Sequence, residues 1–493
     1  MSRLHILMVA SEVSPWAKTG GLADVTGALP AALEDLGHTV TTVLPLYRGV
    51  AAPEGRDLAV RVRVGAFDHE ARLRVVDLTE RRRVVFVDVP RLFNRAGFYG
   101  VDGTDFADNA ERFGVFSAAA LDYAASDANP WPVDVIHAHD WQAGLVPTLV
   151  RNDELYRARF DRAALVFTIH NLAYQGVFDR DVVPQLGLPW SAFTMDTGEF
   201  WGRFSFLKAG ITASDMLTTV SPTYARETQR PEFGAGMEGV LAARADRYVG
   251  ILNGIDTTVW NPATDPLLPA RFDVDDRSGK LICKRALLER FGFAQGDDAL
   301  ARPMVGMVSR LVGQKGLDLI ERAAPDLAAL DAYWVFVGKG DPRYEQFLTG
   351  LAARFPSRIG VFIGFDEALA HLVEAGSDLF LMPSVFEPCG LNQMYSLRYG
   401  TVPVVTAVGG LEDTIQPYTT RAKHANGFKF RDQSPETLVR VLRQATRLYR
   451  DPEIWGPLVE RGMRTDHSWQ TSAGEYVKVY RRARQAAALR AGA

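Results

Sequence analysis

The chain has 493 residues, of which 47% are apolar and 23% charged, as is usual for a globular protein of two large or about three average domains. Its formal net charge of -4 argues against a protein that binds nucleic acid by neutralising phosphates. Two cysteines are too few for a disulfide framework, and no run of about 18 apolar residues predicts a membrane span. The first apolar stretch is too short for a secretory signal, so we expect a cytoplasmic protein.

The first half of the chain alternates strand-like apolar runs with helical patterns, which predicts a parallel sheet built from βαβ units. The runs are residues 6–10, 40–44, 133–137, 165–169 and 217–220. Three further runs alternate polar and apolar side chains, and we interpret them as an antiparallel insertion with one face in water. They are residues 58–64, 71–78 and 83–89. The arginines at 81–83 are interpreted as a solvated turn.

The second half of the chain repeats this alternation and is typical of a doubly wound, nucleotide-binding sheet. Its strand-like runs are residues 305–309, 334–337, 361–363, 379–382 and 402–405. We therefore predict an α/β protein with one Rossmann-like domain over residues 1–250 and a second over 251–465. Residues 472–488 have a helical pattern. We expect the final segment, about 466–493, to form a helix that packs back on the first domain.

A double glycine follows the first predicted strand, in the sequence Lys18-Thr19-Gly20-Gly21, and a helical pattern follows the glycines. Glycines let a ligand approach the backbone closely, and the free amides at a helix start attract anions. Lys18 adds a positive charge, so the segment fits the capture of a phosphorylated ligand. A weaker copy at residues 408–413 follows the run 402–405, which suggests two α/β domains facing one site.

Polar side chains come directly after predicted strands in both halves of the chain. In open α/β sheets, ligands bind beyond the carboxyl ends of the strands. Clusters from both domains therefore predict a site in a cleft between the domains. The residues are Glu12, Lys18, His139, Asp140, His170, Asn171, Arg310, Lys315 and Glu387.

Arg310 and Lys315 stand five residues apart between a predicted strand and a helix. A planar cation and a compact one can grip a diphosphate from two sides. If the diphosphate is a leaving group, they stabilise the charge that develops on it. The alternative is a pair of surface charges, but the adjacent strand and the glycines at 313 and 316 favour a phosphate site.

Glu387 precedes Pro388-Cys389-Gly390 at a predicted strand-to-helix turn. Its carboxylate would lie beside free helix amides, where it could hold sugar or ribose hydroxyls or stabilise positive charge. The alternative is a carboxylate that only complements the helix dipole. Cys389 has no histidine near it in the sequence, so we interpret it as a packed, partly exposed structural cysteine rather than a nucleophile.

His137 and His139 share one face of a strand, so a metal site is an alternative there. No further cluster of cysteine and histidine supports it, and we expect Asp140 and Trp141 to contact a sugar instead. His170 and Asn171 end another strand and suit hydrogen bonds to a sugar, although a strand-end histidine can also be satisfied by the backbone. Asn253 lies in an apparent turn that turn chemistry alone explains, and Tyr99 could equally anchor its loop.

Together these motifs resemble those of the bacterial glycogen synthases, a family related to the plant starch synthases. The resemblance covers nearly the whole chain, and the combination of residues 18–22 (Lys-Thr-Gly-Gly-Leu) with 387–391 (Glu-Pro-Cys-Gly-Leu) is highly specific. It implies a GT-B fold, two Rossmann-like domains with a deep cleft between them. It implies transfer of glucose from ADP-glucose to the non-reducing end of an α-1,4-glucan such as glycogen, with retention of the anomeric configuration. No metal and no organic cofactor are implied.

The resemblance also implies roles for individual residues. The catalytic residues would be Glu387, Arg310, Lys315, His170 and Asp140. Contacts with the donor or the glucan would come from Lys18, Gly20, Gly21, Glu12, Asp24, Tyr99, Asn171, Asn253, Phe365, Cys389, Gly390, Leu391 and Asn392. Arg310 and Lys315 resemble the family's diphosphate clamp, and Glu387 resembles its essential glutamate.

Three positions depart from common patterns. Phe365, the residue expected to stack on adenine, stands where many relatives have tyrosine, and Asn392 stands where threonine is common. Tyr395 occupies the position of a second glutamate found in many other retaining GT-B enzymes, which agrees with the glycogen synthases.

Two other classes of function remain as alternatives: a glucan phosphorylase or UDP-sugar transferase of the same architecture, and a non-catalytic glucan-binding protein.

Overall fold

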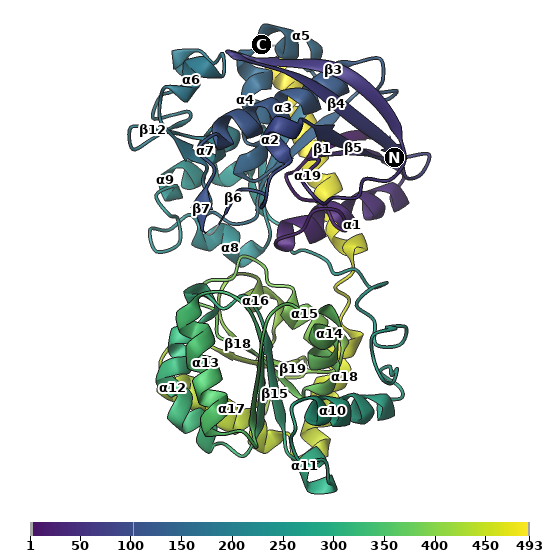
Figure 1. The fold of residues 1–493 in the computed structure, drawn as a ribbon, viewed down its shortest axis with the longest axis vertical. Helices are drawn as coiled ribbons and strands as arrows, with labels where there is room; N and C mark the ends of the chain where they lie inside the picture. The colour runs from purple at the N-terminus through teal and green to yellow at the C-terminus, as the bar shows by residue number, and fades with distance from the viewer. Residues whose placement is uncertain (1–2, 102, 492–493) are drawn as a thin grey trace. The chain divides into compact units, whose positions relative to one another are not determined.

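The structure is a computed structural model that describes residues 3–101 and 103–491 (Figure 1). The chain divides into two compact units. The N-terminal unit comprises Met1–Gly254 together with Trp469–Ala493, and the C-terminal unit is Ile255–Ser468. The chain therefore leaves the N-terminal unit once and returns to it once. No helix among the described residues is long and apolar enough to cross a membrane.

The N-terminal unit is built on a nine-stranded sheet in which neighbouring strands pair in parallel, except for the last two pairings at one edge, which are antiparallel. The chain runs outward from β1 in one direction through β2 and in the other through β8, so the strand order reverses between β1 and β8. Such a reversal is the point where open α/β sheets bind ligands. In spatial order the strands are β14 (Tyr248–Gly250), β13 (Met216–Thr219), β9 (Ala164–Ile169), β8 (Val135–His139), β1 (His5–Val9), β2 (Thr39–Pro45), β5 (Arg82–Asp88), β4 (Phe67–Asp77) and β3 (Arg56–Val64).

Helices and two small sheets complete the N-terminal unit. The long C-terminal helix α19 (Trp469–Ala491) packs against α1 and β9, and its apolar face contributes Tyr476, Tyr480 and Ala483 to a core with Ile6 of β1. The other helices are α1 (Gly21–Asp35), α2 (Pro90–Phe93), α3 (Asn109–Ala125), α4 (Leu145–Asn152), α5 (Glu154–Arg159), α6 (Val182–Gln185), α7 (Phe206–Ala213), α8 (Pro222–Glu227) and α9 (Glu238–Ala242), with short 3₁₀ turns η1 (Trp141–Ala143), η2 (Trp190–Ala192) and η3 (Ala245–Arg247). The small sheets consist of β6 (Gly100–Val101) with β7 (Thr104–Asp105), and of β10 (Val177–Phe178), β12 (Arg203–Ser205) and β11 (Glu199–Phe200).

The predicted antiparallel insertion is partly wrong. β3 and β4 form an antiparallel hairpin with alternating exposure, as predicted. β5 pairs antiparallel with β4, as predicted, but its other edge pairs in parallel with β2. The predicted wet face is wrong for β5, which is almost wholly buried because both of its faces are covered. The solvated turn predicted for the arginine triplet is also wrong at Arg83, which is buried in β5. Its guanidinium donates to Asp77 (2.6 Å) and to the hydroxyl of Tyr123 (3.0 Å).

The C-terminal unit is a six-stranded, fully parallel sheet with the strand order of a doubly wound fold. The order reverses between β15 and β18. The strands are β17 (Ile359–Ile363), β16 (Tyr333–Gly338), β15 (Met304–Val308), β18 (Leu379–Met382), β19 (Val402–Thr406) and β20 (Phe428–Phe430). The helices are α10 (Ser278–Arg290), α11 (Asp297–Ala301), α12 (Leu317–Ala329), α13 (Pro342–Arg354), α14 (Glu367–Gly376), α15 (Asn392–Arg398), α16 (Gly409–Thr414), α17 (Pro435–Leu448) and α18 (Pro452–Arg464), with the 3₁₀ turn η4 (Gly313–Lys315).

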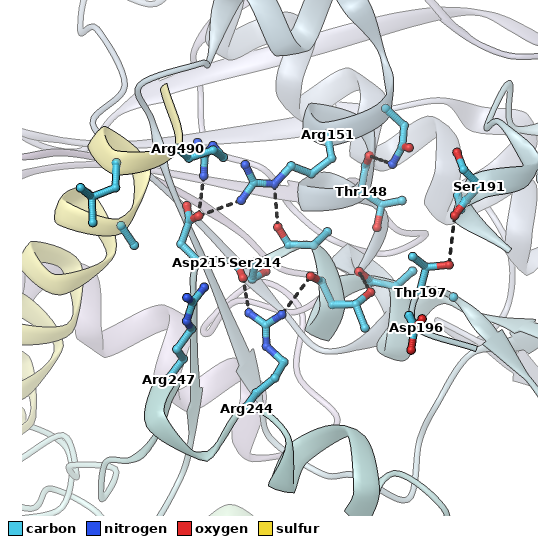
Figure 2. A pocket seen from close by; sticks show the side chains of 18 residues that line it. Thr148, Arg151, Ser191, Asp196, Thr197, Ser214, Asp215, Arg244, Arg247 and Arg490 are labelled. Atoms are coloured by element: carbon cyan, nitrogen blue, oxygen red, sulfur yellow. Dashed lines mark hydrogen bonds and ion pairs between the residues drawn. The ribbon is translucent and has the colours of Figure 1, made fainter. Parts of the chain in front are cut away.

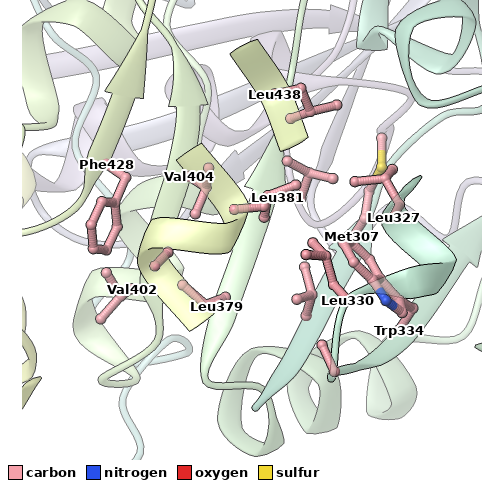
Figure 3. Close-up of a cluster of buried hydrophobic side chains, with 14 of the residues drawn as sticks. Met307, Leu327, Leu330, Trp334, Leu379, Leu381, Val402, Val404, Phe428 and Leu438 are labelled. Carbon is pink, nitrogen blue, oxygen red and sulfur yellow. The ribbon is translucent and has the colours of Figure 1, made fainter. Parts of the chain in front are cut away.

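Alternation along the central strands explains why helices cover both faces of this sheet. Successive side chains of a strand point to opposite faces. Leu379 and Leu381 of β18 therefore enter one core, with Met307 and the ring of Trp334 (Figure 3). Phe380 enters a second core on the other face. Both faces must be apolar for helices to pack on them, which is why the strands read as continuous apolar runs.

The two points where the chain passes between units lie beside each other in the structure. The amide of Ile255 donates to the carbonyl of His467 (2.8 Å), and a β-bridge joins Ile255 to Ser468. A Cβ at Gly254 would lie 2.7 Å from backbone atoms of Trp469. Turn chemistry alone therefore does not explain this segment: Gly254 is required by the close approach of Trp469, which is buried.

Candidate functional site

Glu12 comes directly after β1, at the point where the strand order of the N-terminal sheet reverses. Its buried carboxylate accepts hydrogen bonds from the amide (2.5 Å) and hydroxyl (2.6 Å) of Thr19 and from the hydroxyl of Tyr99 (2.5 Å). Burial raises the pKa of the Tyr99 phenol well above its usual value, so the phenol remains a donor. Glu12 thus fixes the glycine-rich loop and the Tyr99 loop to the end of β1.

The glycine-rich loop leads into α1 and leaves open space beside it. Lys18 Nζ pairs with Asp24 (2.6 Å), and the Lys18 side chain is half exposed. Gly20 has extended backbone, and a Cβ added there would meet no atom within 4 Å. Neither backbone strain nor internal packing therefore requires glycine at position 20. No side chain caps α1, which begins at Gly21, so the loop can accept an anion at the helix start.

Asp140 follows β8, on the other side of the same reversal point. Its φ of 55° lies in the left-handed region, which is uncommon for a residue with a side chain. Its Oδ1 accepts from the amide of His170 (2.7 Å). Burial raises the pKa of the Asp140 carboxyl to about 7, and nearby Glu12 acts in the same direction. Asp140 can therefore gain or lose a proton near neutral pH.

Three buried histidines form a connected cluster beside Asp140. His139 Nδ1 lies 2.9 Å from His170 Nε2, and His137 bonds the hydroxyls of Tyr480 (2.9 Å) and Thr168 (2.6 Å). Burial lowers the pKa of His137 and of His170 to about 3, so these rings are neutral near pH 7. Both nitrogens of His137 are occupied by hydroxyls. Within residues 3–101 and 103–491, no group of three or more histidine, cysteine, aspartate or glutamate side chains could hold a metal ion.

The expected sugar contact by Trp141 is wrong. Its ring is buried, with centroids 5.0 Å from Phe113 and 5.9 Å from Phe178. A Cβ at Gly176 would lie 2.4 Å from the Trp141 ring. The indole is thus a packing residue that supports the Asp140 loop from behind, and its flat face is not available to a ligand.

The side-chain oxygens of two asparagines, Asn171 and Asn253, differ in whether the protein supplies a hydrogen-bond donor to them. Asn171 follows His170 and is partly exposed, and its side-chain oxygen accepts from the amide of Ala173 (3.1 Å). Asn253 is buried, and its Oδ1 has no hydrogen-bond partner in the described part of the chain. An unpaired buried polar atom is costly, so a ligand donor at Asn253 would be stabilising.

In the C-terminal unit, Lys315 and Glu387 meet at the reversal point of the sheet. Lys315 lies in the loop after β15, and Glu387 lies in the loop after β18. Lys315 Nζ donates to Glu387 Oε2 (2.6 Å), and the Ser384 hydroxyl donates to the same oxygen (2.9 Å). The two loops are also joined directly, since the amide of Val385 donates to the carbonyl of Gln314 (2.8 Å). Glu387 is buried, and its carboxylate is fixed before any ligand binds.

Arg310 contrasts with Lys315. Its side chain is exposed, and it makes no hydrogen bond or ion pair to any residue that the structure describes. Arg310 therefore supplies an uncommitted guanidinium a few residues before the committed ammonium of Lys315. Phe365, directly after β17, is 89% exposed, which is unusual for a phenylalanine and leaves its ring free to stack.

The segment after Glu387 is shaped by glycines. Gly390 has a φ of 72°, and Gln393 folds back to donate to the carbonyls of Cys389 and Gly390. Backbone amides of Gly390 and Leu391 have no acceptor within the described residues. The side chain of Asn392 donates to the carbonyl of Val308 (2.8 Å), which ties the start of α15 to the end of β15.

Cys389 and the second glycine motif have packing roles that differ from the sequence interpretation. Cys389 is only 4% exposed, so it is more deeply buried than predicted. A Cβ at Gly409 would lie 1.8 Å from the carbonyl oxygen of Glu387, and one at Gly410 would lie 2.2 Å from that of Cys389. The second double glycine thus lets α16 approach the backbone that carries Glu387.

Sequence reasoning missed the residues that hold the predicted ones in place. Thr19 and Ser384 bond the two buried glutamates, and Gln314 joins the loops of the C-terminal unit. Each is polar and lies beside a glycine or shortly after a strand, since Thr19 precedes Gly20, Gln314 follows Gly313 and Ser384 follows β18, so the same positional signal could have identified them.

Comparison with known proteins gives a consistent result. The family model described as starch synthase catalytic domain matches residues 5–243, and the model described as glycosyl transferases group 1 matches residues 293–457. The chain is 48% identical to a glycogen synthase of Anaeromyxobacter dehalogenans, over 97% of this chain and 99% of the relative. It is 47% identical to a glycogen synthase of Myxococcus xanthus, over the same shares.

Two solved structures are similar to the whole chain. The catalytic domain of starch synthase IV from Arabidopsis thaliana, bound to ADP and acarbose, has a TM-score of 0.89 and 35% identity, covering 98% of this chain and 100% of that one. Sucrose-phosphate synthase from Thermosynechococcus elongatus has a TM-score of 0.58 at 18% identity, covering 97% of this chain and 98% of that one, and shows a shared fold only.

The raised pKa of Asp140 predicts a specific pH dependence of stability. Between pH 4 and 7 the folded state keeps a proton on Asp140 that the unfolded state has lost, so this group stabilises the fold on acidification. The buried neutral histidines act oppositely, because unfolded histidines take up protons below about pH 6.5. Replacing Asp140→Asn removes only the first effect. We expect the variant to lose unfolding free energy more steeply than the parent as the pH falls from 7 to 4.

Urea denaturation at several pH values measures this difference. The matched control is Asp127→Asn, a change at an exposed aspartate of the same unit, which should leave the slope near that of the parent. Equal slopes for the parent and the Asp140→Asn variant would contradict the raised pKa.

Proposed function

The chain belongs to the glycogen synthase family, and we propose that it lengthens α-1,4-glucan by moving glucose from ADP-glucose to the non-reducing end, releasing ADP and retaining the anomeric configuration. Its architecture is the two-domain GT-B fold of glycosyltransferases, as predicted. The observation that carries the proposal is the ion pair between partly buried Lys315 and buried Glu387, with the uncommitted Arg310 in the same loop as Lys315, at the reversal point of a doubly wound sheet.

The C-terminal unit is proposed to bind the nucleotide sugar. Arg310 and Lys315 would neutralise the diphosphate as the bond to glucose breaks, because the leaving group gains negative charge in the transition state. The unpaired amides of Gly390 and Leu391 suit the same phosphates, and Asn392 holds the start of their helix in place. With two cations available, this account uses neither a metal ion nor an organic cofactor.

Glu387 is proposed to do more than neutralise Lys315. Ser384 and Lys315 bond the same carboxylate oxygen, Oε2, so the other oxygen, Oε1, is left for a sugar or ribose hydroxyl. When the diphosphate binds, Lys315 can contact phosphate while it still orients Glu387. Cys389 contributes by packing, since its buried side chain fixes the turn between Glu387 and Gly390.

The N-terminal unit is proposed to contact the transferred glucose and the glucan. Asp140, neutral His170 and Asn171 offer both acceptors and donors to sugar hydroxyls, and the orphaned oxygen of Asn253 would accept from one. Lys18, with its partner Asp24, lies beside the open space at Gly20 and Gly21 and suits the donor phosphates. Glu12 and Tyr99 act by holding this loop in place.

For the chemical step we propose attack of the acceptor hydroxyl on the face that the diphosphate leaves, with the departing phosphate taking the proton. A double displacement would need a carboxylate nucleophile. Lys315 and Ser384 both bond Glu387 through Oε2, and burial raises the pKa of Asp140 to about 7, so each carboxylate is less nucleophilic than a free, ionised one, which favours attack on the same face. Exclusion of water would protect the donor from hydrolysis.

Phe365 is proposed to stack on the adenine ring, since it is the exposed aromatic residue after β17. Such a contact does not read the edge of the base, so a UDP-sugar donor is the main alternative.

A phosphorylase with pyridoxal phosphate would be revealed by its absorbance, and a glucan-binding protein would release no nucleotide. We propose the cytoplasm as the location, where ADP-glucose and glycogen would both be available.

Substitution Glu387→Ala tests the proposed site. It removes the carboxylate that orients Lys315, so we expect turnover with ADP-glucose and glycogen to fall by orders of magnitude while the circular dichroism spectrum stays that of the parent. The control is Glu453→Ala, which removes an exposed glutamate from the first turn of α18 and should lower turnover little. If both variants kept near-normal turnover, Glu387 would serve only the helix dipole.

Phe365 can be tested separately through the donor. Replacing Phe365→Ala removes the exposed ring, and we expect the KM for ADP-glucose to rise about 5- to 100-fold, from the stacking energy of a base on an aromatic ring. The conservative variant Phe365→Tyr keeps the ring and should keep the KM near that of the parent. An unchanged KM in the alanine variant would show that adenine binds elsewhere.

A further inference from the structure

The N-terminal unit contains a cavity of about 630 Å³ that the proposed reaction does not use. It lies among α4, α7, η3 and the last turns of α19 (Figure 2). None of the residues predicted to bind donor or glucan lines it. Its size falls within the usual range for sites that hold a small molecule.

The cavity wall carries an excess of positive charge. Four arginines and two aspartates line it, which leaves two positive charges without a counterion in the lining. They are Arg151, Arg244, Arg247, Arg490, Asp196 and Asp215. An anion bound in the cavity would compensate these charges, and Arg is well suited to planar or tetrahedral oxyanions.

Asp215 is already shared by two arginines and a backbone amide. Its Oδ1 accepts from both Arg151 (2.7 Å) and Arg490, and its Oδ2 accepts from the amide of Leu165 (2.8 Å). Figure 2 shows Arg151 and Arg490 converging on this carboxylate, with Arg244 and Arg247 beside it. Neither Arg244 nor Arg247 forms an ion pair with Asp215 among the described residues.

Arg244 is partly satisfied by backbone. It donates to the carbonyls of Thr212 (3.0 Å) and Ser214 (2.5 Å) at the C-terminal end of α7, where a cation is favourable. Its Nε is buried with no acceptor among the described residues. Burial lowers the pKa of Arg244, and repulsion from Arg247 acts in the same direction. Attraction to Asp215 and Asp246 offsets this lowering only in part. Helix capping thus explains two of its donors and leaves the buried Nε without an acceptor.

Arg247 is the least constrained member of the group. Its guanidinium pairs only loosely with the adjacent Asp246 (3.5 Å), and its side chain is 52% exposed. Arg247, unlike Arg244, does not cap α7. Helix packing therefore gives no reason for an arginine at this place on the cavity wall.

The other side of the cavity is polar and carries one negative charge, that of the exposed Asp196. It presents hydroxyls and an amide that can bond the hydroxyls of a ligand: Thr148, Asn152, Ser191 and Thr197. We propose that this cavity binds a small phosphate monoester with a hydroxyl-bearing body. Arg244 and Arg247 hold the phosphate, and the polar wall bonds the body of the molecule. This site is separate from the donor site and does not depend on the proposed reaction.

Calorimetric titration of the full-length protein tests the proposal, with saturating ADP present to occupy the nucleotide site. The probes are a hexose 6-phosphate, a triose phosphate, inorganic phosphate and the free hexose. We expect a monoester to bind more tightly than inorganic phosphate or the free hexose. Replacing Arg247→Gln should weaken that binding roughly tenfold or more, as expected for loss of a charge-assisted hydrogen bond.

The matched control is Arg157→Gln, a change at an exposed arginine of α5 outside the cavity, which should bind as the parent does. Arg247 has no buried contact, so its variant is expected to fold and to keep the basal transfer rate. Hydrogen exchange should slow in residues 206–215 and 484–491 when the monoester binds. Binding unchanged by Arg247→Gln, no binding of any monoester, or protection confined to the C-terminal unit would each overturn the proposal.

Discussion

The ion pair between Lys315 and Glu387 is the constraint from which the C-terminal unit is best understood. The pair joins the loops that follow β15 and β18, the two neighbouring parallel strands between which the strand order reverses. Ser384 donates to the same carboxylate and helps to fix it. A buried ion pair is costly to break on one side only, since removing the lysine strands a buried carboxylate. The close packing of Gly409 and Gly410 on the Glu387 loop follows from the same need, because it holds the carboxylate in position from behind.

The N-terminal unit solves a similar geometric problem with different electrostatics. Glu12 and Asp140 flank the equivalent reversal point, but no lysine that the structure describes pairs with either of them. Hydrogen bonds hold Glu12, and burial raises the pKa of Asp140 to about 7, while neighbouring His170 stays neutral. The C-terminal unit therefore carries Arg310 and Lys315, two cations suited to a diphosphate. The N-terminal unit carries, besides Lys18, hydrogen-bonding groups such as Asp140 and neutral His170 that are suited to sugar hydroxyls. This contrast is what a glycosyl transfer between a charged donor and a neutral glucan requires.

Much of this organisation could be predicted from the sequence, because apolar runs followed by glycine or polar residues mark the carboxyl ends of parallel strands. Lys315 and Glu387 were identified in this way. The failures have a physical cause in tertiary packing: Arg83 is buried because Asp77 and Tyr123 bond it, and Trp141 faces a core rather than a ligand. No local pattern reveals that a Cβ at Gly409 would collide with Glu387, or that Asp140 titrates near neutral pH.

The most direct test of the whole account is the release of nucleoside diphosphate by the purified protein, comparing ADP-glucose with UDP-glucose, each with and without glycogen. We expect ADP release that depends on glycogen and is much faster than UDP release. Release from UDP-glucose alone would contradict the assigned donor while leaving the fold and the diphosphate clamp intact. No glycogen-dependent release from either donor, by folded protein, would contradict the central claim that this chain is a glucan-elongating transferase.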